Sequence, residues 1–140
     1  MVRIRINARR SKKYAKVDNN YLGDARRIVG QATDLVRNDV LRSLQSGSKR
    51  GITYIKSSPS RVHVASAPGE APATDTGFLA SNVYKEVENK GLTGIVESRA
   101  PYSSDLEFGT TKIAPRPFMQ PALEENRNKI RRLFQRGFKA

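Results

Sequence analysis

The sequence of 140 residues has no cysteine, no tryptophan and a single histidine, His63. Without cysteine, a disulfide or a thiolate metal site is excluded, which suits a reducing cytosol. No apolar run approaches the roughly 18 residues that a membrane-spanning helix needs. The N-terminus is basic, but no apolar segment follows it, so we predict no signal peptide and expect synthesis in the cytoplasm.

The sequence also lacks the groupings of side chains that catalysis requires. His63 has no second histidine or cysteine as co-ligand, and we interpret it as structural or surface-exposed. The loop carboxylates are Glu70, Asp75, Asp105 and Glu107, and the last two would diverge on a helical turn. A two-metal nuclease needs carboxylates from several strand ends with a supporting lysine, and no such pattern occurs. We therefore predict no enzyme, no cofactor and no metal.

Acidic residues are few beside the basic ones: 13 Asp and Glu against 26 Lys and Arg, a net charge of +13. This balance favours nucleic acid or acidic proteins as partners, although a solvated basic surface is the alternative. There is no zinc finger, no helix-turn-helix spacing and no aromatic pair for base stacking. Any binding to nucleic acid would therefore be sequence-neutral and salt-dependent.

Residues 1–17 are predicted to be a basic N-terminal arm, and residues 18–140 a single domain. Val2, Ile4 and Ile6 alternate with polar residues and predict a short strand. This strand would pair with another chain or become ordered on assembly. The basic side chains expected to face DNA or an acidic partner are Arg3, Arg5, Arg9, Arg10, Lys12 and Lys13.

From about residue 18 to 46, apolar residues recur at helical spacing, and Gly47 is placed to end this long helix. The patterns that follow predict, in order, strands at 52–55 and 62–65, an irregular loop at 67–77, a short helix at 77–82, strands at 83–87 and 92–97 joined by a turn at 89–91, and a helix from Pro121. This order predicts an α+β fold, in which an antiparallel sheet of about four strands packs against the N-terminal and C-terminal helices and carries extended loops.

Residues 100–122, APYSSDLEFGTTKIAPRPFMQPA, combine prolines, aromatics and a Gly-Thr-Thr turn before the last helix. Pro115 and Pro117 predict an extended approach to that helix. Gly109 predicts a turn that a bulky residue could not adopt. Three apolar residues are candidates for a subunit interface, with core packing beneath the last helix as the alternative: Phe108, Phe118 and Met119.

Three motifs, in this order, resemble those of the neck and tail-completion proteins of tailed bacteriophages. Residues 65–79, ASAPGEAPATDTGFL, are similar to the loop "ASAPGEAP…DTG.L" of that family. Tyr102 and residues 106–110 resemble its motif "Y….LE.GT". Residues 116–122 resemble its motif "RPF(M/L).PA". Order and spacing agree from about residue 22 to 138.

The resemblance implies a virion structural protein that forms a ring, commonly a hexamer, at the head–tail junction or the top of the tail tube. Such a ring joins or terminates the tail and lets DNA pass. Its partners would be its own copies and other neck, connector or tail-tube proteins, with no membrane. The loop 67–77 would be an inter-subunit arm or an ordinary surface loop. A basic, non-specific nucleic-acid-binding protein is the alternative function. The candidate interface or anchoring residues are Pro68, Gly69, Phe78, Tyr102, Phe108, Gly109, Arg116, Phe118 and Met119.

Overall fold

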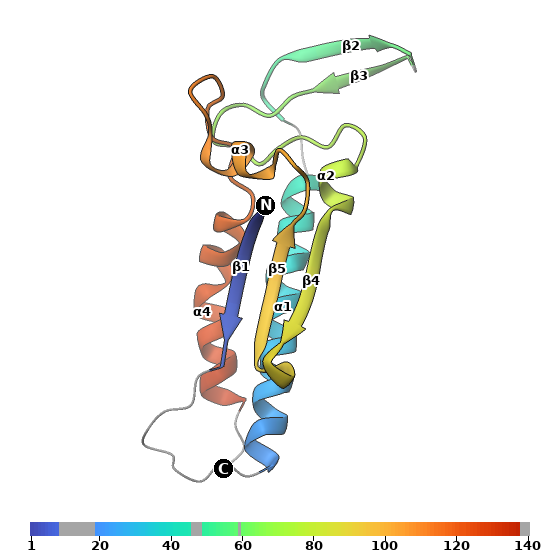
Figure 1. Ribbon diagram of the computed structural model, residues 1–140. Coiled ribbons are helices and arrows are strands. Elements are labelled where there is room, and N and C mark those ends of the chain that lie inside the picture. The colour runs from blue at the N-terminus through green and yellow to red at the C-terminus, as the bar shows by residue number, and fades with distance from the viewer. Residues whose placement is uncertain (9–18, 46–48, 59, 138–140) are drawn as a thin grey trace.

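The computed structural model describes residues 1–8, 19–45, 49–58 and 60–137. It has the predicted α+β fold, with a long N-terminal and a C-terminal helix (Figure 1). The strands are β1 (Val2–Asn7), β2 (Thr53–Ser57), β3 (Ser60–Val64), β4 (Val83–Glu88) and β5 (Thr93–Ser98). The helices are α1 (Asn19–Gln45), α2 (Phe78–Ser81), α3 (Ser103–Phe108) and α4 (Gln120–Arg136), and a single 3-10 turn, η1, spans Asn89–Gly91.

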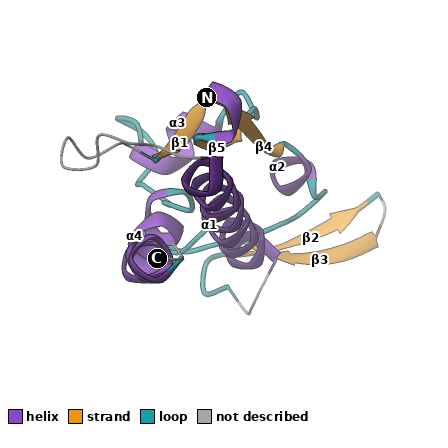
Figure 2. Cartoon of the chain, turned by 90° about the horizontal axis from the view of Figure 1, so that it is seen from below, coloured by secondary structure: helices purple, strands orange, loops and turns teal. Residues whose placement is uncertain are grey.

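The main sheet is antiparallel and has three strands in the order β1-β5-β4. Helix α1 packs along one face of this sheet, and α4 packs against α1 (Figure 2). Every residue of the central strand β5 is buried. Gly94 allows the close approach of the helix, because a Cβ there would lie 1.8 Å from the Oγ1 of Thr33 on α1.

The expectation of one sheet of about four strands is wrong. The predicted hairpin forms, but within the described ranges β2 and β3 pair only with each other and make a separate two-stranded ribbon. Charged side chains on one face of this ribbon, Lys56 and Arg61, pair with Asp75 of the following loop. That face is therefore unsuited to packing on an apolar helix, and the ribbon stands away from the body (Figures 1 and 2).

The N-terminal strand was predicted correctly, but its expected partner was wrong. β1 pairs with β5 of its own chain, and Val2, Ile4 and Ile6 are buried in the core. The reason is physical: leaving three alternating apolar side chains in water costs more than adding one edge strand to the sheet. β1 thus lies in the sheet of the domain, while residues 9–17 of the predicted arm are outside the described part.

The predicted helix at 18–46 and the predicted last helix are confirmed as α1 and α4. Gly47, its expected end, lies outside the described residues. The turn at 89–91 is confirmed, and all three of its residues have positive φ, with values of 51°, 54° and 89°. Helix α3 was not predicted, because six residues show no helical periodicity and its N-cap, Tyr102, is not one of the residue types that signal a helix start.

Candidate assembly surface

The three motifs that carry the family resemblance meet at one end of the molecule, above the sheet in Figure 1. The Gly69 N–H donates to the Pro115 carbonyl at 3.0 Å. Arg116 links all three segments, because its N–H donates to the Leu106 carbonyl at 2.6 Å and its Nε donates to the Ser66 carbonyl at 3.3 Å. These backbone contacts fix the loop 65–79, α3 and the approach to α4 relative to one another.

Glu107 connects α3 to the start of α4. Its buried carboxylate accepts hydrogen bonds from the N–H groups of Phe118 at 2.9 Å, Met119 at 3.0 Å and Gln120 at 2.7 Å. These are donors that a helix N-terminus leaves without an internal partner, and the helix dipole favours a negative charge there. The acid of the second motif therefore caps the helix that the third motif begins. Asp105 is exposed, so the two carboxylates diverge as predicted.

Glu70 fixes the turn at the start of the long loop. It pairs with Arg50 at 2.6 Å and accepts the N–H groups of Ala67 at 2.9 Å and Arg50 at 3.1 Å. The hydrogen bond from the Arg50 side chain, followed by those from the two backbone N–H groups, lowers the pKa of the Glu70 carboxyl to about 2. Gly69 supports this turn with a φ of +83°.

We expect the folded chain to lose stability as the pH falls from about 4.5 to about 2, in part because of Glu70. Its pKa is depressed on folding, so its contribution is complete above its unfolded pKa of 4.5 and is lost as the pH falls through its folded pKa of about 2. Glu70→Gln should therefore lower the thermal midpoint at pH 7 and flatten its decline between these pH values. Thermal unfolding at a series of pH values measures this. In Glu125→Gln, an exposed control, the decline should match the parent; an equal flattening would contradict this role.

Asp75 holds the β2–β3 ribbon to the loop. Its carboxylate pairs with Lys56, lies 2.8 Å from the Nη2 of Arg61, and lies 3.8 Å from the Nδ1 of His63. The hydrogen bond from Lys56, opposed by burial and assisted by the charges of Arg61, Lys56 and His63, lowers the pKa of Asp75. His63 thus has a structural position, as the sequence indicated.

A hollow of about 280 Å³ lies between the ribbon base, the long loop and α3. Apolar and aromatic side chains dominate its lining, including Pro72, Leu79 and Leu106. Phe78 and Tyr102 lie at 6.1 Å between ring centroids and leave much of each ring exposed. His63 and Asp75 close the side next to the ribbon.

The ribbon itself exposes apolar side chains. Ile55 is 84% exposed and Val62, directly opposite it across the strands, is 67% exposed. Side chains alternate between the faces of a strand, so these two point away from the face that carries Lys56 and Arg61. Tyr54 is also exposed, but it lies on the face of Lys56 and Arg61, so the outward apolar pair is Ile55 and Val62. An apolar patch of this kind, rimmed by polar groups, is typical of an interaction surface.

The structure brings most of the predicted interface candidates to this end of the molecule but divides them by exposure. Pro68, Gly69, Phe78, Tyr102 and Phe108 are exposed. Gly109 makes the predicted turn, with a φ of +74°, and Arg116 is half-buried. Phe118 and Met119 are buried in the core beneath α4, so core packing, the alternative reading, describes them. Sequence reasoning missed the exposed pair Ile55 and Val62 and the capping role of Glu107. The pair could have been found, because both residues are β-branched and lie opposite each other in the predicted hairpin. No sequence pattern indicated the cap.

The basic residues predicted to face a partner are distributed differently. Arg3 pairs with Glu97 of the same chain at 2.7 Å, on the sheet face opposite α1, while Arg5 is exposed. Burial acts to raise the pKa of Glu97, but hydrogen bonds and charges from Arg99 and Arg3 together lower it. The remaining residues, Arg9, Arg10, Lys12 and Lys13, lie outside the described part of the chain.

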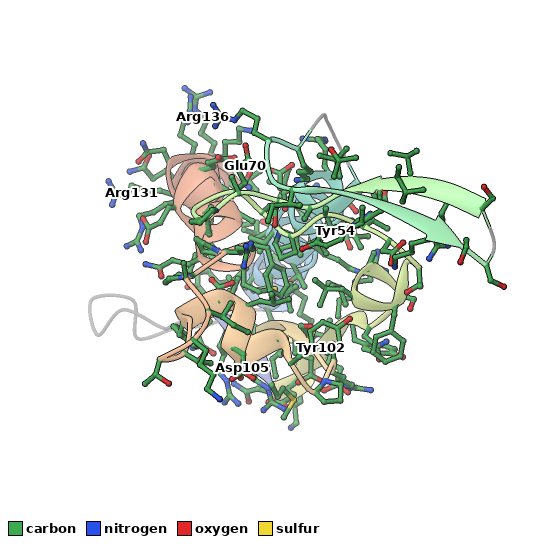
Figure 3. All side chains as sticks on the ribbon, turned by 90° about the horizontal axis from the view of Figure 1, so that it is seen from above. Tyr54, Glu70, Tyr102, Asp105, Arg131 and Arg136 are labelled. Carbon is green, nitrogen blue, oxygen red and sulfur yellow. The ribbon has the colours of Figure 1, made fainter. Side chains whose placement is uncertain are left out.

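Helix α4 exposes a basic face. Arg131 and Arg136 point away from the body at the side opposite Tyr102 and Asp105 (Figure 3). Arg127 pairs with Glu124 at 2.8 Å. Four other basic residues on this helix make no ion pair within the described ranges: Lys129, Arg131, Arg132 and Arg136.

Comparison of the chain with protein-family models, with curated proteins and with solved structures gave no match. Among residues 1–8, 19–45, 49–58 and 60–137, no three histidine or acidic side chains are grouped closely enough to hold a metal ion. No helix in the same ranges combines the length and apolar character that crossing a bilayer needs.

Proposed function

We propose that this chain is a virion subunit of a tailed bacteriophage that forms an oligomeric ring at the head–tail junction or the top of the tail tube, with no enzymatic role. One observation carries the proposal. The three motif segments are locked together beside a ribbon whose apolar pair Ile55 and Val62 is exposed. Segments that fix the backbone shape, next to an exposed apolar pair, are typical of a surface that binds another protein.

The alternative, a basic and non-specific nucleic-acid-binding protein, is favoured by the basic face of α4. Within the described part of the chain, four residues of this face make no ion pair: Lys129, Arg131, Arg132 and Arg136. A helix with this spacing of cations can neutralise several phosphates. The two functions are compatible if the ring encloses DNA, but they differ in what the isolated chain does. A ring subunit should assemble without DNA, whereas a nucleic-acid-binding protein should bind DNA without a second copy of the chain.

Sedimentation velocity of the full chain, with and without a short DNA duplex, tests the proposal. We expect a DNA-free oligomer of defined mass at micromolar concentration, and negative-stain images with a central opening. Any affinity tag used for purification should be at the C-terminus. The Met1 ammonium donates to the Oγ of Ser104 on α3 at 3.1 Å, and an N-terminal tag would disturb this contact. A chain that stays monomeric at all concentrations and binds DNA with a steep salt dependence would overturn the proposal and support the alternative.

A further inference from the structure

We infer that the β2–β3 ribbon of one copy docks by its outer face, Ile55 and Val62, into the hollow beside Phe78 and Tyr102 of a second copy. The inference rests on the proposed function and names the contact that builds the ring. The ribbon and the hollow are different surfaces of one chain. A contact between them is head-to-tail, and such contacts form closed rings when the rotation between copies closes.

The ribbon needs a partner on its outer face. A two-stranded ribbon is marginally stable on its own in water, and here only its inner face is held, through the ion pairs of Lys56 and Arg61 with Asp75. Ile55 and Val62 are directly paired and point the other way. The chain therefore cannot bury this pair in its own hollow, because His63 of the inner face lines that hollow.

The charges of the two surfaces are complementary. Residues 49–64, which contain the ribbon, carry four basic residues and no acidic one. Three of them pair with Glu70 or Asp75, so the segment together with these two acids keeps an excess of two positive charges. Residues 100–111, which contain α3, carry two acidic residues and no basic one. Glu107 is buried at the start of α4, so Asp105 is the negative charge that this segment presents to solvent. Asp105 is exposed, and its carboxylate makes no ion pair within the described ranges. A basic ribbon that approaches this helix is attracted, whereas the basic α4 face repels it.

The free edge of the main sheet is a poorer docking surface. Among the described residues, β4 pairs with β5 on one side only, so its other edge could add a strand from another copy. Its exposed side chains include Lys85, Glu86 and Glu88, and charges of this kind protect an edge against pairing. The outer face of the ribbon, formed by residues 53, 55, 57, 60, 62 and 64, carries no charged side chain.

The test uses two variants of the full chain that each lose one of the two surfaces. The ribbon variant, Ile55→Thr with Val62→Thr, keeps β-branched residues and removes apolar surface. The hollow variant, Phe78→Arg, places a cation where the basic ribbon would dock. Each alone should be monomeric, with a self-dissociation constant raised roughly 30-fold or more. An equimolar mixture should form a complex of two copies and stop there, because only one intact ribbon and one intact hollow remain.

Controls separate docking from folding and from general loss of apolar surface. Both variants should keep the circular dichroism spectrum and the cooperative unfolding of the parent. Val87→Thr removes an apolar group that is 54% exposed on β4 and should leave the oligomer unchanged. Asp105→Lys should weaken assembly more than Glu125→Lys, the same charge change on α4.

Each other result overturns the inference. If both variants still form the parent oligomer, the ring is built elsewhere, and the proposed function stands without this contact. If only the ribbon variant dissociates, ribbons pair with ribbons in a symmetric contact. If the mixture stays monomeric, the two surfaces do not meet. If the parent chain itself is monomeric at all concentrations, the ring proposal fails together with the inference.

Discussion

Phe118→Ala should lower the free energy of unfolding by about 3 to 5 kcal/mol, the usual cost of removing a buried aromatic side chain. Phe118 is 1% exposed and packs in the core with Met119 and residues of β1 and α1. Replacing the Phe118 ring with a methyl group would leave a cavity in the core, next to the start of α4. Chemical denaturation monitored by circular dichroism measures the loss, which should appear as a lower denaturant midpoint with an unchanged slope.

Phe108 provides the matched control for this prediction. It is the same residue type, ten positions earlier, and is 67% exposed. Phe108→Ala should change the free energy of unfolding by no more than about 0.5 kcal/mol. If the two variants lose equal stability, the position of Phe118 in the core is wrong. If Phe118→Ala keeps full stability and loses only assembly, the interface hypothesis from the sequence is correct instead.

Glu107→Ala should cost about 3 kcal/mol, because three N–H groups at the start of α4 lose a charged acceptor in a buried place. Glu107→Gln should cost less, since the amide keeps one acceptor oxygen but brings its own donors toward those N–H groups. Chemical denaturation gives the stability loss. Hydrogen exchange should show reduced protection at Phe118, Met119 and Gln120, the three donors.

Glu124→Ala is the control for the cap. Glu124 lies on α4 itself, is exposed, and pairs with Arg127 one turn later. Exposed pairs of this kind contribute little, so the loss should stay below about 0.5 kcal/mol. Equal losses for Glu107→Ala and Glu124→Ala would show that the carboxylate of Glu107 does not hold the helix start.

The capping role also bears on the nuclease hypothesis that the sequence disfavoured. Both oxygens of Glu107 accept backbone N–H groups, so this carboxylate is already occupied by the fold. Asp105 lies on another face of α3 and is exposed. Of the other two loop acids, Glu70 fixes a turn and Asp75 fixes the ribbon. Glu70, Asp75 and Glu107 are thus held by different partners, and Asp105 is exposed.

Local patterns in the sequence were sufficient to predict most of the elements. The 3.6-residue period of α1 and the alternation of Val2, Ile4 and Ile6 both describe single faces that must be buried, and both are buried. Gly109 and the glycine-ending sequence at 89–91 each indicated a turn, and both turns form with positive φ. In each case the residues that determine the helix, strand or turn all lie within that one short segment.

The wrong expectations concern pairings between distant segments. Alternation predicts that β1 is a strand but not that its partner lies some 90 residues later. The separation of the β2–β3 ribbon depends on Asp75, which binds Lys56 and Arg61 from a loop with no regular pattern. The role of Glu107 depends equally on a helix start that lies 13 residues further along. No periodicity in the sequence predicts such contacts between distant segments.

The pairing of β1 with β5 has a consequence for synthesis on the ribosome. Residues 2–7 emerge first, yet their partner strand, 93–98, is made only after some 86 further residues have been added. At about 5 to 20 residues per second, the nascent chain waits roughly 4 to 17 seconds with its first apolar strand unpaired. The order of translation thus leaves Val2, Ile4 and Ile6 open to chaperones, and to neighbouring nascent chains, until two-thirds of the protein exists.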